Sequence, residues 1–164
     1  IHADSSKIIV MGDSAGGNLS AVLARKHRQD VLAQVLIYPV LDATLTSQSV
    51  AQYPDAPILS KHMMQFFVDC YIRTQADKYE QDVSPLFATD FNHLPPCLMI
   101  TGEFDILRED GFAYVQKLKA AGNQTQHEHY PDIHGFLSLP HLCASTQEAT
   151  QAIVKFVQEK SSVG

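Results

Sequence analysis

Short runs of apolar, often β-branched residues alternate along the chain with segments that have the period of an amphipathic helix. The apolar runs predict four strands, at 7–11, 33–38, 97–101 and 125–130. The periodic segments predict helices at about 18–27, 60–73, 111–121 and 144–160. Because the first strand, helix and strand fit within about 30 residues, as in a βαβ unit, the pattern predicts an α/β fold with a parallel sheet and flanking helices.

Individual residues refine these elements. Leu19, Val22 and Leu23 fall on one face of the first helix. Ser60 is placed to cap the second helix, and Gly122 is placed to end the third. The fourth strand alternates with polar residues, which favours a position nearer the edge of the sheet.

Composition excludes several classes of function. The chain has 164 residues, 45% of them hydrophobic and 18% charged, as is ordinary for one soluble domain. Its formal net charge of −6 argues against nucleic-acid binding, and no apolar stretch approaches the roughly 18 residues of a membrane span. Cys70, Cys97 and Cys143 lack metal-ligand spacing and favour a reducing compartment. With no signal-peptide pattern at its start, the protein is expected in the cytoplasm.

The segment Gly12-Asp13-Ser14-Ala15-Gly16 fits the motif G-x-S-x-G. It lies between a buried strand and a helix, where this motif forms a nucleophile elbow. Such a turn holds the serine in a strained backbone conformation at the end of the strand. The start of the following helix favours negative charge, so we expect the Ala15 N–H to donate to an oxyanion. A plain glycine-rich turn is the alternative.

A serine nucleophile requires a base, and His134 is the best placed of the eight histidines, in the loop after the fourth strand. His127 and His129 alternate within that strand and are expected to pack on the sheet. The remaining histidines are expected to face solvent: His2, His27, His62, His93 and His141.

The histidine needs a carboxylate, and Asp105 follows the third strand on the same rim as Ser14. Glu103 and Asp110 are competitors, although Asp110 is expected to start the next helix. The order Ser14, Asp105, His134 is the order of α/β-hydrolases.

These motifs together resemble the hormone-sensitive-lipase family of α/β-hydrolases, which includes bacterial acetyl esterases and carboxylesterases. The matching segments follow the family's order: GDSAGGNL at 12–19, YP at 38–39, SPL at 84–86, LPP at 94–96, GEFDILR at 102–108 and HGF at 134–136. The resemblance implies an α/β-hydrolase fold with Ser14 as nucleophile, Asp105 as orienting acid and His134 as general base. Ile106 departs from the family, in which proline commonly follows the acid.

The family also has an upstream His-Gly-Gly-Gly loop that supplies further oxyanion donors, and these 164 residues contain no such run. We therefore expect residues 1–164 to be a partial α/β-hydrolase domain, lacking its N-terminal portion and supplying the C-terminal half of the sheet. Without the loop the isolated chain is expected to be nearly inactive. By resemblance, segment 41–80 is expected to be a cap or a pocket-lining insertion, although most of the apolar side chains of its helix are expected to belong to the core.

The expected activity is that of a serine carboxylesterase acting through an acyl-enzyme on a small-molecule ester. Short acyl chains are implied by the resemblance alone, and neither a metal nor an organic cofactor is expected. One alternative is a peptidase or amidase on the same fold. Another is a non-catalytic ligand-binding protein, like the plant hormone receptors that resemble this family. Those receptors lack the catalytic histidine, whereas His134 is present here.

Overall fold

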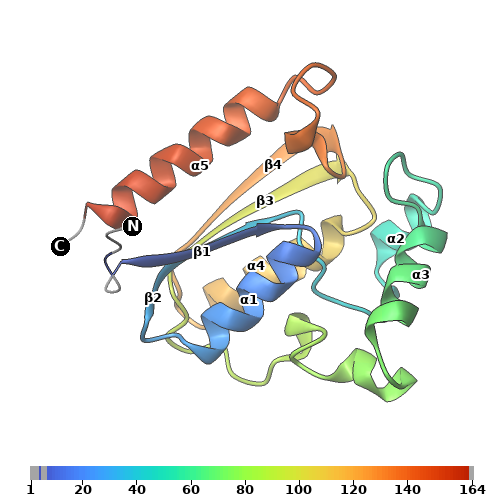
Figure 1. The fold of residues 1–164 in the computed structure, drawn as a ribbon, viewed down its shortest axis with the longest axis horizontal. Helices are drawn as coiled ribbons and strands as arrows, with labels where there is room; N and C mark the ends of the chain where they lie inside the picture. The colour runs from blue at the N-terminus through green and yellow to red at the C-terminus, as the bar shows by residue number, and fades with distance from the viewer. Residues whose placement is uncertain (1–3, 5–6, 163–164) are drawn as a thin grey trace.

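The computed structural model describes residue 4 and residues 7–162, and its centre is a four-stranded parallel sheet (Figure 1). The strands are β1 (Ile8–Asp13), β2 (Val31–Ile37), β3 (Cys97–Phe104) and β4 (Thr125–Ile133). They are hydrogen-bonded in the order β1-β2-β3-β4, which confirms the predicted parallel sheet and the edge position of the last strand. In this register the C-terminal ends of all four strands meet at one rim of the sheet.

Helices cover both faces of the sheet. In Figure 1, α1 (Ala15–Lys26) and α4 (Arg108–Ala120) lie against one face, and α5 (Thr146–Ser161) lies against the other. Leu36, Met99 and Leu118 belong to the buried cluster under α1 and α4. The opposite cluster includes Ile100 and Phe156. The alternation of core residues along β2 and β3 therefore supplies two separate cores.

The apolar stripe of α1 faces away from the sheet, contrary to the usual amphipathic rule. Leu19 and Leu23 are 54% and 46% exposed, whereas Ala21 and Ala24 are fully buried. The helix lies so close to the sheet that a Cβ at Gly17 would approach the Cβ of Pro39 to 2.7 Å. Small residues therefore form its buried face, because larger ones would not fit.

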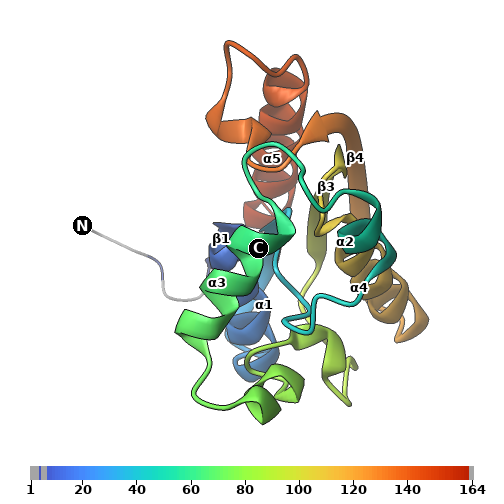
Figure 2. The same cartoon turned by 90° about the vertical axis from the view of Figure 1, so that its right-hand side faces the viewer.

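The first part of the chain between β2 and β3 forms a layer beyond the C-terminal rim (Figure 2), and its last part, from Pro85 on, packs against α1 and α4. This connection contains α2 (Gln48–Gln52), α3 (Lys61–Tyr71) and the short 3₁₀ helices Gln75–Tyr79 and Pro85–Phe87. Ser60 caps α3 as predicted, since its Oγ accepts a hydrogen bond from the Met63 N–H at 3.2 Å. The helix α2 was not predicted. A third 3₁₀ helix, Phe136–Ser138, follows β4.

Candidate active site

Ser14 occupies a tight turn between β1 and α1. Its φ of +52° lies in the left-handed region, which is strained for a residue with a side chain. Its N–H donates to the Ile37 carbonyl at 2.9 Å, which ties the turn to β2. A Cβ at Gly12 would lie 2.2 Å from the Gly16 carbonyl oxygen, so glycine at position 12 permits this turn. The sequence motif and the backbone geometry therefore agree.

The structure brings Ser14, Asp105 and His134 together, although Ser14 and His134 are separated by 120 positions in the chain. The Nε2 atom of His134 lies 3.0 Å from Ser14 Oγ, and its Nδ1 lies 2.7 Å from Asp105 Oδ2. Because a carboxylate accepts hydrogen bonds, the Nδ1–H donates to Asp105 and leaves Nε2 free to accept the Ser14 hydroxyl proton. Asp105 is 1% exposed and His134 is 6% exposed, so water has little access to the contact.

Aromatic packing holds the His134 ring. The Tyr38 ring centroid lies 4.8 Å from that of His134, and Phe136 packs edge-on against Tyr38 at 5.7 Å. Burial raises the pKa of Tyr38, which therefore stays neutral beside the site. Gly135 has a φ of +75°, which turns the chain so that Phe136 is buried directly after His134. The Tyr38-Pro39 pair was visible in the sequence, but only as part of a family resemblance.

The two competing carboxylates lie elsewhere. Glu103 is bound by Arg108 and His129, and this pairing, led by the His129 hydrogen bond, lowers the pKa of Glu103. Asp110 lies in the first turn of α4, as predicted, and is buried near Asp42. The carboxylate that contacts His134 is that of Asp105.

The Asp110 carboxyl should make stability depend on pH. Burial, with the Asp42 charge nearby, raises its pKa from 3.8 to about 8. The folded state then keeps a proton that the unfolded chain releases near pH 4, so this group lowers stability as pH rises from about 4 to about 8. Asp110→Asn is expected to melt above the wild type at both pH values, with a difference several degrees larger at pH 8.5 than at pH 5. Calorimetry at both pH values measures this, and an equal difference at both would contradict it.

The other histidines lie away from Ser14. His127 and His129 lie on one face of β4, where one nitrogen of each ring contacts Thr101 Oγ1: His127 Nε2 at 2.8 Å and His129 Nδ1 at 2.9 Å. Across the described part of the chain, no three His, Cys, Asp or Glu side chains are placed to hold a metal ion. His2 lies outside the described residues, and the others predicted to face solvent are exposed: His27, His62, His93 and His141.

A mostly apolar pocket of about 410 Å³ opens beside Ser14. The α1 side contributes Ala15, Asn18 and Leu19. Asn18 is buried and donates from Nδ2 to two carbonyls, those of Val40 at 2.7 Å and Val83 at 2.8 Å. Asn18 therefore joins α1 to the chain between β2 and β3, a role that the sequence did not reveal. The rest of the lining comes from residues 40–83: Val40, Ala43, Leu59, Met64, Phe67, Val68, Tyr71 and Val83.

Residues 1–138 match the family model described as the alpha/beta hydrolase fold, and the chain belongs to this family. Ethyl acetate hydrolase of Pseudomonas putida is 30% identical over 162 residues, covering 95% of this chain and 51% of that protein. Arylesterase of Saccharolobus solfataricus is 34% identical over 157 residues, covering 93% and 51%. A solved esterase of Pyrobaculum calidifontis has a TM-score of 0.90 at 36% identity, covering 95% of this chain and 53% of that one.

These matches confirm the resemblance to the hormone-sensitive-lipase group that the sequence motifs indicated. The chain spans about half the length of the relatives just described. None of the helices in residues 7–162 has both the length and the apolar character needed to cross a bilayer.

Proposed function

We propose that the protein is a serine carboxylesterase, with Ser14 as nucleophile, His134 as general base and Asp105 as the acid that orients His134. The observation that carries this proposal is the position of His134, whose two ring nitrogens contact Ser14 Oγ at 3.0 Å and Asp105 Oδ2 at 2.7 Å. A hydroxyl paired with an oriented imidazole is the arrangement that nucleophilic catalysis requires. The printed names of the relatives, ethyl acetate hydrolase and arylesterase, support an ester as the substrate.

In the proposed reaction, Ser14 Oγ attacks the ester carbonyl carbon while His134 Nε2 takes the hydroxyl proton. The Ala15 N–H, at the start of α1, helps to stabilise the oxyanion. His134 then protonates the leaving alcohol, and the acyl group remains on Ser14. Water, deprotonated by His134, attacks the acyl-enzyme; the bond between Ser14 Oγ and the acyl carbon breaks, the acid is released, and His134 returns the proton to Ser14 Oγ. The Asp105 carboxylate stabilises the imidazolium in both steps.

We further propose that the apolar pocket beside Ser14 takes the acyl group and that segment 41–80 acts as its cap. Met64 and Val68 of α3 are buried and line this pocket, whereas Phe67 and Tyr71 line it while largely exposed. The helix thus supplies both core and pocket side chains. A preference for short acyl chains is supported by similarity to the ethyl acetate hydrolase.

The test compares p-nitrophenyl acetate, butyrate and octanoate with acetyl p-nitroanilide, on the natural full-length gene product. That form is used because the chain spans about half the length of its relatives. We expect the acetate and butyrate to give kcat/KM values at least tenfold above the octanoate, and the anilide to react far more slowly. Faster turnover of the anilide would instead indicate an amidase. The absence of turnover on every substrate would favour a ligand-binding protein.

A further inference from the structure

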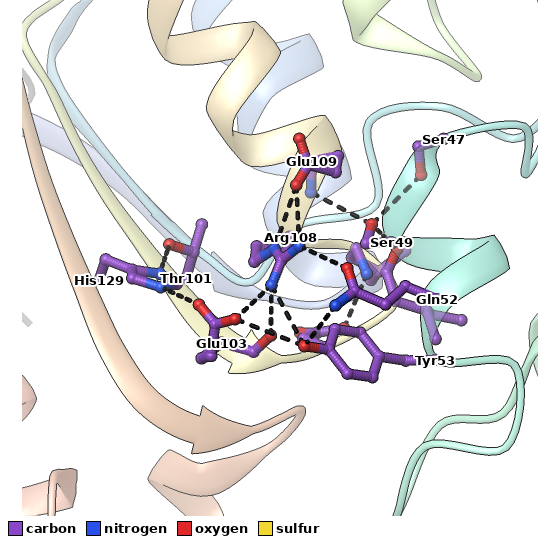
Figure 3. A network of polar contacts seen from close by, with 12 residues as sticks. Ser47, Ser49, Gln52, Tyr53, Thr101, Glu103, Arg108, Glu109 and His129 are labelled. Carbon is purple, nitrogen blue, oxygen red and sulfur yellow. Dashed lines mark hydrogen bonds and ion pairs between the residues drawn. The ribbon is translucent and has the colours of Figure 1, made fainter.

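The turn that carries Asp105 is held by one buried arginine, Arg108, which is 9% exposed (Figure 3). Its Nη1 donates to the backbone carbonyl of Glu103 at 3.0 Å and to the Glu103 carboxylate at 2.5 Å. Its Nη2 donates to the Gln52 side chain and to the Glu109 carboxylate, each at 3.0 Å. Arg108 therefore joins the residues on both sides of Asp105 to the helix α2.

Ser49 of α2 holds the same turn from another direction. Its side chain is fully buried, and its Oγ donates to the Ile106 carbonyl at 2.6 Å. The same oxygen accepts a hydrogen bond from the Glu109 N–H at 3.3 Å. The Ile106 carbonyl and the Leu107 N–H belong to one peptide unit, and that N–H donates to Asp105 Oδ1 at 2.8 Å. Ser49 therefore fixes the peptide that hydrogen-bonds the Asp105 carboxylate.

Glu103 continues this network to the sheet. His129 Nε2 lies 2.8 Å from its carboxylate, and the Tyr53 hydroxyl donates to it at 3.4 Å. Thr101 contacts the other ring nitrogen of His129 at 2.9 Å. The polar contacts are thus continuous from β4, through Glu103 and Arg108, to α2, as Figure 3 shows.

Asp105 has few contacts of its own. Apart from His134, its carboxylate accepts a hydrogen bond from the Leu107 N–H at 2.8 Å, within the same turn. The position of the carboxylate is therefore set by the path of the backbone. An error of about 1 Å in such a position can cost roughly 100-fold in rate.

We infer that Arg108 and Ser49 are positioning residues that hold Asp105 against His134, and that α2 thereby takes part in building the site. This inference rests on the proposed roles of Asp105 and His134. Neither residue contacts Ser14 or lines the pocket, so their loss should lower kcat and leave KM within about twofold.

A double-mutant cycle on the natural full-length gene product separates positioning from general damage to the fold. Arg108→Met is expected to lower kcat about 10- to 100-fold in the wild-type background, and less than threefold when Asp105→Asn is already present. Ser49→Ala is a milder change and should lower kcat less, and this loss should likewise shrink when Asp105→Asn is already present. Arg28→Met is the matched control, since Arg28 binds Asp90 and Asn92 beyond the far end of α1, and it should keep wild-type kcat.

A second readout does not need turnover. Proton NMR with ¹⁵N-labelled histidine detects the proton between His134 Nδ1 and Asp105, which should shift or vanish in Arg108→Met and Ser49→Ala and persist in Arg28→Met. The inference would be overturned if Arg108→Met lowered kcat by the same factor with and without Asp105→Asn. It would also be overturned if the proton resonance were unchanged in both Arg108→Met and Ser49→Ala. If the wild-type protein lacks hydrolysis that depends on Ser14, the proposed function fails, and the resonance still decides whether Arg108 and Ser49 position Asp105.

Discussion

Replacing Ser14 by alanine is expected to lower kcat/KM for p-nitrophenyl butyrate about a million-fold, to the rate of the uncatalysed background. The Ser14 hydroxyl is the group that His134 Nε2 contacts at 3.0 Å, and the alanine variant has no oxygen there to attack the ester. The φ of +52° at position 14 is kept by the surrounding turn, so the variant should still fold. Steady-state kinetics on the natural full-length gene product measure the loss.

Ser20 offers a matched control for this variant. It lies in the same helix, α1, and is buried, but it does not line the pocket. Ser20→Ala is expected to retain wild-type activity. A Ser14→Ala protein that still hydrolyses the ester at an appreciable fraction of the wild-type rate would show that another group is the nucleophile.

Replacing His134 by alanine is expected to lower activity nearly as far, because the Ser14 hydroxyl would then have no base to accept its proton. The same kinetic assay measures this loss, and added imidazole is expected to restore part of it by entering the vacated space. His141→Ala is the control, since His141 is exposed in the same connection between β4 and α5. A His134→Ala protein with most of its activity would require a different base.

The three candidate catalytic residues could be predicted from the sequence because each follows a strand. In a parallel sheet the strand ends share one rim, so Ser14 after β1, Asp105 after β3 and His134 after β4 were expected on the same rim. The choice of Asp105 over Glu103 depended on the family resemblance of segment 102–108, because both carboxylates follow Ser14 and precede His134 in the sequence. The structure supplies the physical reason, since the Glu103 carboxylate is bound by Arg108 and His129.

The residues around this rim could not be predicted in the same way. Helix α2 has five residues, too few to show a helical period, and Ser49 meets Ile106 from 57 positions away. Arg108 lay outside the helix predicted at about 111–121, whereas α4 begins at Arg108, and the sequence did not indicate that this side chain is buried. Such contacts depend on how the layer beyond the rim packs, which local sequence does not encode.

The exposure of the apolar face of α1 also depends on tertiary packing. Leu19 and Leu23 have helical spacing, but glycine and alanine permit the closer approach to the sheet, so the small residues are buried instead. A periodicity argument weighs hydrophobicity alone and takes no account of the distance between the helix and the sheet.

The central claim, that Ser14 is an activated nucleophile, is tested most directly by covalent labelling with a fluorophosphonate, followed by mass spectrometry of the digested protein. We predict a single phosphonyl group on the peptide that contains Ser14, and no adduct on the Ser14→Ala or His134→Ala variants. An adduct on a different residue, or an unlabelled protein that nevertheless hydrolyses p-nitrophenyl butyrate, would contradict the account.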